Sequence, residues 1–271
     1  MVSNSVFIWL VVMIIGGVLL AVIPAIWWIK TRHEKITTVL VGAATWFVFA
    51  QILETIPKLI LFNPALEISN TIRGSVLLYT LVGCLLAGIF EETGRFVAFK
   101  TVLKNRTNKE TAISHGIGHG GFEALFLMVV TGIQYIVYAI LVNTGKIQEI
   151  IDQAASQGAS IDEVNAVVDS IKTITFVSVG LSLYERVFAI LLHVGLSILV
   201  FYAVRERKTW MYILSIVLHG LFDVPAALYQ TGVIALPIIE IILTVYATVF
   251  FAIVYMVLYK KDTDEVQEEG V

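Results

Sequence analysis

The stretch Ser5–Ile29, SVFIWLVVMIIGGVLLAVIPAIWWI, contains no charged side chain and decides the class of fold. A helix needs about 20 predominantly apolar residues to cross the hydrocarbon core of a bilayer, and this stretch is long enough. It lacks a basic leader and a small-residue cleavage signal, and it ends near Trp27 and Trp28, residues typical of the membrane interface. The sequence therefore predicts a retained transmembrane helix here.

The composition of the whole chain extends this prediction. Of its 271 residues, 58% are hydrophobic and only 14% are charged, and the mean hydropathy is +0.88. A soluble domain is about 45–50% apolar and about 25% charged, so the soluble classes are excluded. A net charge of -3 excludes a basic nucleic-acid-binding protein. The single cysteine, Cys84, excludes an intramolecular disulfide and a cysteine-based metal site.

Seven apolar windows are long enough to span a membrane. They cover roughly residues 5–29, 36–62, 75–99, 112–142, 173–204, 209–230 and 233–259. We therefore expect an all-α fold, a polytopic transmembrane helix bundle. It is expected to form one domain over residues 1–261, with the motif-bearing helices at about 75–230 and an acidic, disordered tail at 262–271.

The basic residues predict the orientation of the spans, because short loops rich in Lys and Arg stay on the cytoplasmic side. Only four basic residues, Lys58, Arg73, Lys146 and Lys172, fall on one side of the seven-span arrangement. We therefore expect the N-terminus outside and the C-terminus in the cytoplasm. The basic residues on the opposite, cytoplasmic side are Lys30, Arg32, Lys35, Lys100, Lys104, Arg106, Lys109, Arg205, Arg207, Lys208, Lys260 and Lys261.

The longest stretch outside the predicted spans covers about residues 143–172. Its spacing of apolar and acidic residues is typical of two short amphipathic helices around Ser156-Gln157-Gly158. We expect an extracytoplasmic loop that either lies on the lipid headgroups or covers an external opening.

In four of the predicted spans, ionisable residues cluster at mid-depth. Each such residue costs at least about 2.5–3.5 kcal/mol on insertion scales, so it is a candidate for a functional role. Counted at about 1.5 Å per residue from the cytoplasmic ends, these side chains lie at depths of about 10–21 Å. Four helices thus bring carboxylates and imidazoles to one layer in the cytoplasmic half of the bilayer. The candidates are Glu92, with Glu91 beside it, His119, Glu123, His193, His219 and Asp223.

Two pairs in this layer have the spacing of metal ligands on one helix face. His119 and Glu123 are four residues apart, and so are His219 and Asp223. Imidazole together with carboxylate suits zinc, which takes three protein ligands in catalytic sites. The expected cofactor is therefore Zn²⁺, held by three or four groups from two or three helices.

Glu91 and Glu92 are the candidates for a general base. Adjacent residues of a helix point about 100° apart, so the two side chains cannot face the same atom. A carboxylate that does not bind the metal can take a proton from the water that the metal acidifies. We expect one of the two to be this base and the other to pair with Arg95 or Arg186. Either arginine could also stabilise the charge that develops on the substrate.

The same polar layer is compatible with two other classes of function. A non-catalytic membrane scaffold or binding protein would use it as a hydrogen-bonded network or as a site for lipid headgroups. A proton-coupled transporter would use it as a proton relay. Metal content separates the peptidase from both alternatives.

In their order along the chain, these motifs resemble those of the YhfC family of intramembrane metalloproteases. That family is related to the PrsW proteases, to the CAAX-prenyl-protease and bacteriocin-processing group, and to the multipass scaffold subunit of gamma-secretase. The resemblance covers roughly residues 88–230 and implies a core of four helices around a metal-dependent glutamate and histidine site. The motifs are Glu91-Glu92-x-x-Arg95, a glycine-rich His119-x-x-x-Glu123, His193 and His219-x-x-x-Asp223.

Carried over by motif, the resemblance implies that Glu91 or Glu92 is the base and that His193 and His219 are ligands. It also implies that Glu123 and Asp223 complete or support the metal site. Two positions depart from the pattern. At position 123, CAAX-type enzymes have His, whereas PrsW-like members have Glu, as this chain does. At His119, both groups usually have Phe.

The residues and the resemblance together predict an intramembrane zinc-dependent endopeptidase. It is expected to hydrolyse a peptide bond of a membrane-associated substrate in the cytoplasmic half of the bilayer. The expected partners are the lipid bilayer and a membrane-associated protein or peptide substrate, with no nucleic acid. We expect a multi-pass integral protein of a bacterial plasma membrane.

Overall fold

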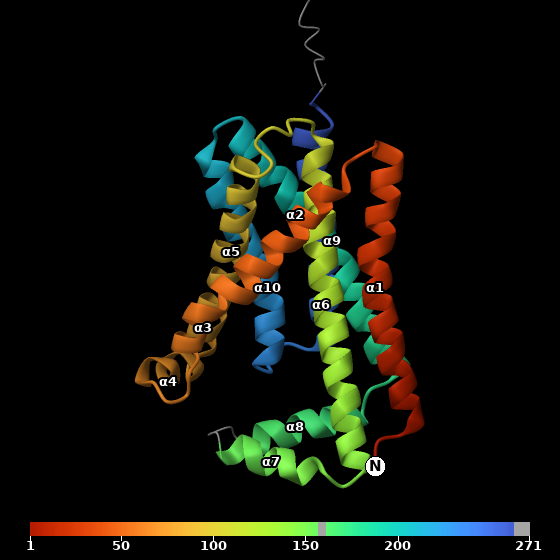
Figure 1. Ribbon diagram of the computed structural model, residues 1–271. Helices are drawn as coiled ribbons and strands as arrows, with labels where there is room; N and C mark the ends of the chain where they lie inside the picture. The colour runs from red at the N-terminus through yellow and green to blue at the C-terminus, as the bar shows by residue number, and fades with distance from the viewer. Residues whose placement is uncertain (157–160, 263–271) are drawn as a thin grey trace, which may run out of the picture. The chain divides into compact units, whose positions relative to one another are not determined.

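The structure is a computed structural model that describes residues 1–156 and 161–262 of the chain. These residues form helices and no strand (Figure 1). Seven of their helices are long and apolar enough to cross a membrane, which confirms the predicted helical, seven-span fold. The seven candidate spans are Asn4–Arg32, Ile36–Leu61, Val76–Lys100, Glu110–Asn143, Phe176–Arg205, Thr209–Gln230 and Leu236–Tyr259.

The predicted turn at Gln157-Gly158 and residues 263–271 of the predicted tail lie outside the described residues.

Two of the seven spans contain a π-helical segment, and short helices lie between some of the spans. In chain order the elements are α1 (Asn4–Arg32), α2 (Ile36–Trp46), η1 (Phe47–Leu53), α3 (Thr55–Leu61), α4 (Glu67–Arg73), α5 (Val76–Lys100), α6 (Glu110–Asn143), α7 (Ile147–Ser156), α8 (Ile161–Lys172), α9 (Phe176–Arg205), α10 (Thr209–Gln230), α11 (Leu236–Val254) and η2 (Tyr255–Tyr259).

The chain divides into two compact units that share three helices. The first unit consists of Met1–Leu20 and Ala124–Arg186, and the second of Ala21–Glu123 and Val187–Val271. The boundaries fall inside α1, α6 and α9, so each of these helices contributes to both units. Every predicted site residue except Arg186 belongs to the second unit.

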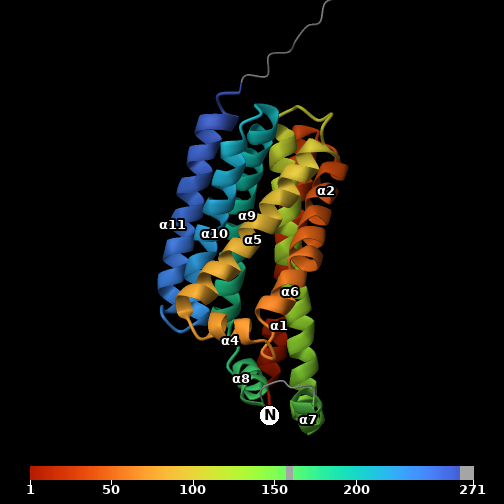
Figure 2. The ribbon, with the colours of Figure 1, turned by 90° about the vertical axis from the view of Figure 1, so that its left-hand side faces the viewer.

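The first unit has its own apolar core. Leu10 of α1, Ala139 of α6 and Ile171 of α8 are fully buried in it. The side-chain oxygen of Asn143 accepts a hydrogen bond from the backbone N–H of Val2 at 2.6 Å, and its amide nitrogen donates to the backbone C=O of Val2 at 3.0 Å. These two bonds hold the first residues of the chain against the end of α6. The helices α7 and α8 lie side by side (Figures 1 and 2), where the amphipathic spacing predicts two short helices.

The second unit is built around α9. Of the most apolar 18-residue window of α9, 78% is buried, against 33% or less for every other candidate span. Leu192, Leu196 and Val200, which follow one another at helical spacing, are fully buried. The helices α5 and α10 pack along each other in both views (Figures 1 and 2). This pairing positions the acidic motif of α5 against the His219 motif of α10.

Glycines let the backbones of α2, α6 and α9 approach closely. A Cβ on Gly118 would overlap the backbone of Val39, and one on Gly42 would overlap the backbone carbonyl of His115. A Cβ on Gly116 would lie 2.5 Å from the Cα of Val194. Since α6 is helical throughout, these glycines serve close packing and not local unwinding.

The second span contains a π-helix that the sequence does not reveal. Within η1, the backbone N–H of Glu54 bonds the carbonyl of Phe49 at 2.9 Å, the i to i+5 spacing of this helix type. Phe49 packs against Gly94 of α5, whose Cβ, if present, would lie 2.7 Å from the Phe49 ring. The π-helix therefore presents an aromatic side chain to α5 at Gly94.

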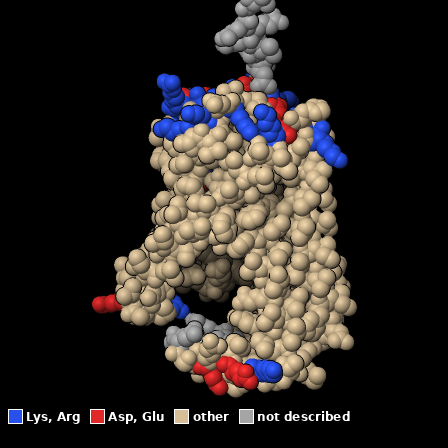
Figure 3. Space-filling view, in the orientation of Figure 1, with Lys and Arg blue, Asp and Glu red and all other residues tan. Residues whose placement is uncertain are grey.

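Lysine and arginine residues gather at one end of the second unit (Figure 3). There Arg205 donates to a carboxylate oxygen of Asp262 at 2.6 Å, and the Tyr202 hydroxyl donates to the same oxygen at 2.6 Å. Asp262 therefore belongs to the folded part of the chain and not to the predicted tail. The basic side chains lie together at one end, as the predicted orientation of the spans requires. Which side of the membrane this end faces stays a prediction.

Candidate metal centre

The helix α5 carries an acidic motif into the interior of the second unit. Glu92 and Arg95 are fully buried, and Glu91 is 7% exposed. The motif reaches α10 because Gly88 allows close approach: a Cβ there would lie 2.6 Å from the carbonyl oxygen of Ile216. Burial of three ionisable groups in an apolar helix indicates that they satisfy one another or bind a ligand.

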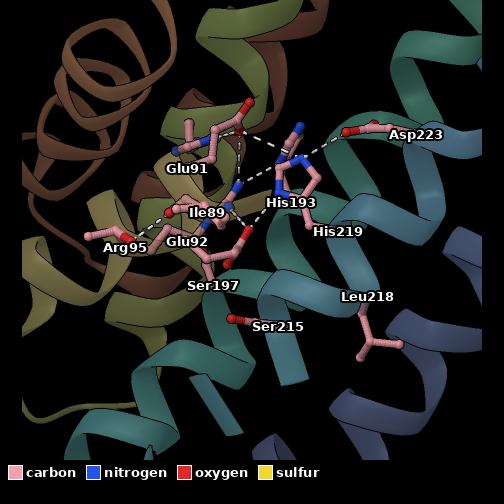
Figure 4. A network of polar contacts seen from close by, with 12 residues as sticks. Ile89, Glu91, Glu92, Arg95, His193, Ser197, Ser215, Leu218, His219 and Asp223 are labelled. Carbon is pink, nitrogen blue, oxygen red and sulfur yellow. Dashed lines mark hydrogen bonds and ion pairs between the residues drawn. The ribbon is translucent and has the colours of Figure 1, made fainter. Parts of the chain in front are cut away.

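The two adjacent glutamates face different partners. Oε1 of Glu92 is ion-paired with Arg95 and lies 2.7 Å from Nδ1 of His219 (Figure 4). Oε2 of Glu91 lies 2.8 Å from Nε2 of His119 and 3.9 Å from a guanidinium nitrogen of Arg95. This is the divergence expected of neighbours on a helix. Glu92 is therefore engaged in a structural network, while Glu91 faces the histidine of α6.

The helices α6 and α9 add a second pair of charged and imidazole groups. Oε2 of Glu123 lies 2.6 Å from Nε2 of His193, and Nδ1 of His193 lies 2.5 Å from Arg95. Because a guanidinium can only donate, Nδ1 is the acceptor here, so Nε2 carries the ring proton and donates it to Glu123. A metal ion bound at Nε2 would replace this proton. His193 is pressed against α6 where Gly120 leaves room, and its ring centroid is 5.0 Å from that of His119.

Four of these residues could hold one metal ion. One ligand atom each from Glu91, His119, Glu123 and His193 lies within 4.8 Å of all the others. Ligands at about 2.0–2.2 Å from one ion lie at most about 4.4 Å apart. Small side-chain movements would therefore bring the four atoms to coordinating distance.

The chemistry of the group fits a divalent metal. Imidazole nitrogens and carboxylate oxygens are ligands that zinc accepts. The Nδ1 atom of His119 is buried without a hydrogen-bond partner among the described atoms, so this ring has unused binding capacity. Glu91 and Glu92 lie beside the guanidinium of Arg95, and Glu123 belongs to the same group as Glu91. A divalent cation would offset the excess negative charge of these three carboxylates.

His219 and Asp223 lie beside this group. Nε2 of His219 is 3.9 Å from Glu91 and 3.7 Å from the Asp223 carboxylate (Figure 4). The His219 side chain is almost completely buried, whereas the Asp223 side chain is 32% exposed. The structure thus places both near the centre, and their role as ligands stays a prediction.

His115 and Arg186 each have partners outside the group that could hold a metal. His115 is fully buried and lies 3.2 Å from the hydroxyl of Ser197 and 3.4 Å from that of Thr45, as expected of a hydrogen-bonding histidine. Ser197 and Thr45 were not predicted, because single hydroxyls in apolar helices carry no distinguishing signal. Arg186 lies in the first unit and pairs with Glu185, so its proposed role at the site stays a prediction.

Comparisons with known proteins identify the family of the chain. The family model described as YhfC intramembrane metalloprotease matches residues 16–244, which include every residue of the centre. The chain belongs to the YhfC intramembrane metalloprotease family. A YhfC protein of Bacillus subtilis (strain 168), described as an uncharacterized membrane protein, is 34% identical over 208 residues, 76% of this chain and 79% of its own length. No solved structure matches the chain.

The family and the seven apolar helices together establish the cellular setting. This YhfC family member is a multi-pass integral membrane protein with a bacterial relative, as predicted. The family's description implies a metal and peptide substrates. The His and Glu residues described above are a group that could bind such a metal.

Proposed function

We propose that this YhfC family member is a zinc-dependent endopeptidase that cleaves a membrane-associated substrate within the bilayer. The observation that carries the proposal is the convergence of Glu91, His119, Glu123 and His193 from three helices within 4.8 Å. We assign His119, His193 and Glu123 as the ligands. Two histidines and a glutamate are a known ligand set of hydrolytic zinc sites, which use three protein ligands.

A zinc ion in this group would supply a Lewis acid that acidifies water and polarises the peptide carbonyl. Glu91 is then the base. It accepts a proton from the attacking water and returns a proton to the leaving amine. Glu91 suits this role better than Glu92, because Glu92 is fully buried and already bound by Arg95 and His219.

The remaining charged groups position the reacting ones. Arg95 contacts both Glu92 and His193 and so ties α5 to α9. His219 joins Glu92 to the edge of the site, where Asp223 is the most exposed of the site's ionisable side chains. We infer that substrate approaches from the side of Asp223.

We place the site in the cytoplasmic half of the bilayer. Glu91 lies nine residues before Lys100, a distance of about 14 Å along α5. Lys100 belongs to the basic end of the second unit, which the distribution of basic residues assigns to the cytoplasm.

Proteolysis in a defined system tests the proposal. The full chain, reconstituted in liposomes with membrane proteins from cells that lack it, should generate new protein N-termini detectable by mass spectrometry. Glu91→Gln and removal of zinc by a chelator should each abolish them, and added zinc should restore them. Glu67→Gln, which changes an exposed carboxylate on α4, is the matched control and should cleave normally. Equal cleavage by the Glu91→Gln variant, or no cleavage at all, would count against a peptidase and favour a scaffold or transporter.

A further inference from the structure

A second polar site lies at the basic end of the second unit, away from the Glu91 centre. It is a cavity of about 300 Å³ lined by residues 33–35, in the turn between α1 and α2, and residues 105–108, in the loop between α5 and α6. Every lining side chain is polar or charged. Such a cavity in a mostly apolar chain is suited to a polar ligand.

The charges that the cavity offers are mainly positive. Lys35 is exposed and makes no ion pair among the described residues, and Arg106 lines the same cavity. The carboxylate of Glu34 is already occupied, since it accepts hydrogen bonds from Ser114 at 3.1 Å and from Asn108. The cavity therefore presents cationic donors, while its acidic member holds the two loops together.

The walls of the cavity are held in place by contacts within the protein. Arg106 donates to the hydroxyls of Thr37, at 2.7 Å, and Thr38 in the first turn of α2. His33 adopts a left-handed backbone conformation, with φ of 55°. This conformation is unfavourable for a residue other than glycine, and such residues occur at binding sites as well as in turns.

A smaller, mainly apolar pocket adjoins the cavity. Its volume is about 70 Å³, and it shares Arg106 and Thr107 with the cavity. Phe99 and Phe201 form part of its wall, which also includes the basic residues Lys104 and Arg205. A ligand with an anionic group in the larger cavity could therefore place an apolar substituent in the smaller pocket.

We propose that this pair of pockets binds a phosphate ester with an apolar substituent. Lys35 and Arg106 supply charge to the phosphate, and Asn105 and Thr107 supply neutral polar groups. The volume of the cavity is in the range of small-molecule sites. The ligand is either the headgroup of an anionic phospholipid or a soluble phosphate, because both share the chemistry that these residues recognise.

Two probes distinguish the sources. The full chain in an uncharged detergent is titrated with inorganic phosphate and followed by calorimetry. In parallel, it is placed in phosphatidylcholine nanodiscs with or without phosphatidic acid, and native mass spectrometry measures the lipid retained. Binding of phosphatidic acid alone assigns the site to a lipid headgroup. Binding of inorganic phosphate assigns it to a phosphate that soluble compounds can also supply. Either result supports the proposal, and binding of neither probe overturns it.

A pair of threonines provides the matched variants. Thr107→Asp adds a negative charge to the shared wall of the two pockets, whereas Thr101→Asp adds the same charge to an exposed residue at the end of α5, outside both linings. We expect Thr107→Asp to weaken binding about tenfold or more and Thr101→Asp less than about twofold. Equal weakening by both variants would show non-specific charge attraction and overturn the site.

Two lysine variants distinguish a loss of ligand binding from a loss of folding. Lys35→Gln should weaken binding, whereas Lys208→Gln, at an exposed lysine outside the cavity, should not. Both side chains are exposed, so both variants should unfold at the temperature of the wild type. Unchanged binding by Lys35→Gln together with Thr107→Asp would exclude a phosphate site here.

Discussion

Oε1 of Glu92 lies 2.7 Å from Nδ1 of His219, although 127 residues separate them. The same oxygen is ion-paired with Arg95, so Glu92 closes a buried network between α5 and α10. Its neighbour Glu91 instead lies 2.8 Å from His119. Two adjacent carboxylates thus have different surroundings, and the proposed mechanism depends on this difference.

Neutral variants of the two glutamates should behave differently. Glu91→Gln is expected to lower cleavage by about 10²–10⁴-fold, the usual contribution of a general base, with little change in unfolding temperature. Glu92→Gln leaves Arg95 without its closest carboxylate and should lower the free energy of unfolding by about 3–5 kcal/mol. Cleavage assays and thermal unfolding of the purified variants measure both effects. An active Glu91→Gln variant and a stable but inactive Glu92→Gln variant would reverse the assignment of the base.

The pairing of Glu92 with Arg95 can be measured by a double-mutant cycle. Arg95→Gln alone leaves a fully buried carboxylate without its guanidinium and should destabilise the protein by about 3–5 kcal/mol. The Glu92→Gln, Arg95→Gln double variant has no unpaired charge at these positions and should lose less than the sum of the singles. Additive losses in unfolding free energy would contradict a direct ion pair.

Glycine variants test the close packing that supports the centre. Gly42→Ala places a Cβ against the backbone of α6 at His115, so it should lower both the unfolding temperature and the amount of folded protein. Gly83→Ala is the matched control, because a Cβ at Gly83 would have no neighbouring atom within 4 Å and alanine favours a helix by about 0.8–1 kcal/mol. In unfolding experiments on the purified proteins, Gly42→Ala should therefore be less stable than the wild type and Gly83→Ala at least as stable. Equal stability of the two variants would argue against the contact between α2 and α6.

The contact at the C-terminal end of the last span should depend on pH. Hydrogen bonds from Arg205 hold the pKa of Asp262 below its usual value of 3.8. The pKa of Asp262 is lower in the folded state than in the unfolded state. The contact therefore stabilises the fold fully above the usual pKa of 3.8, and this stabilisation is lost as the pH falls through the folded pKa. At pH 7, Asp262→Asn should lower the unfolding temperature by about 2 °C, as expected for roughly 1 kcal/mol. The difference from wild type should disappear as the pH falls through the folded pKa, and a difference that grows in acid would contradict the contact.

Much of the fold could be predicted because lipid imposes a simple rule on sequence. Every span must be long and apolar, so the windows at residues 5–29 and 209–230 match α1 and α10 within a few residues. The same rule makes ionisable residues conspicuous. Glu91, His119 and His193 stand out on this ground alone, without knowledge of their contacts.

What could not be predicted depends on contacts between distant segments. The angle between Glu91 and Glu92 follows from helix geometry, but the partner of each does not. The π-helix near Phe49 has no signature in composition. Asp262 has the sequence surroundings of an acidic tail, and its partners, Tyr202 and Arg205, lie about 60 residues away.

The content of bound metal shows whether the group of Glu91, His119, Glu123 and His193 holds an ion. His119 and His115 are one helical turn apart on α6 and both fully buried, but only His119 belongs to the group that could hold an ion. Zinc in the purified, chelator-free protein should amount to about one ion per chain in the wild type and in His115→Asn. His119→Asn should lose it, with binding weakened at least about tenfold, equivalent to about 1.4 kcal/mol. A wild-type protein without metal, or a His119→Asn variant that retains it fully, would contradict a zinc site at this group.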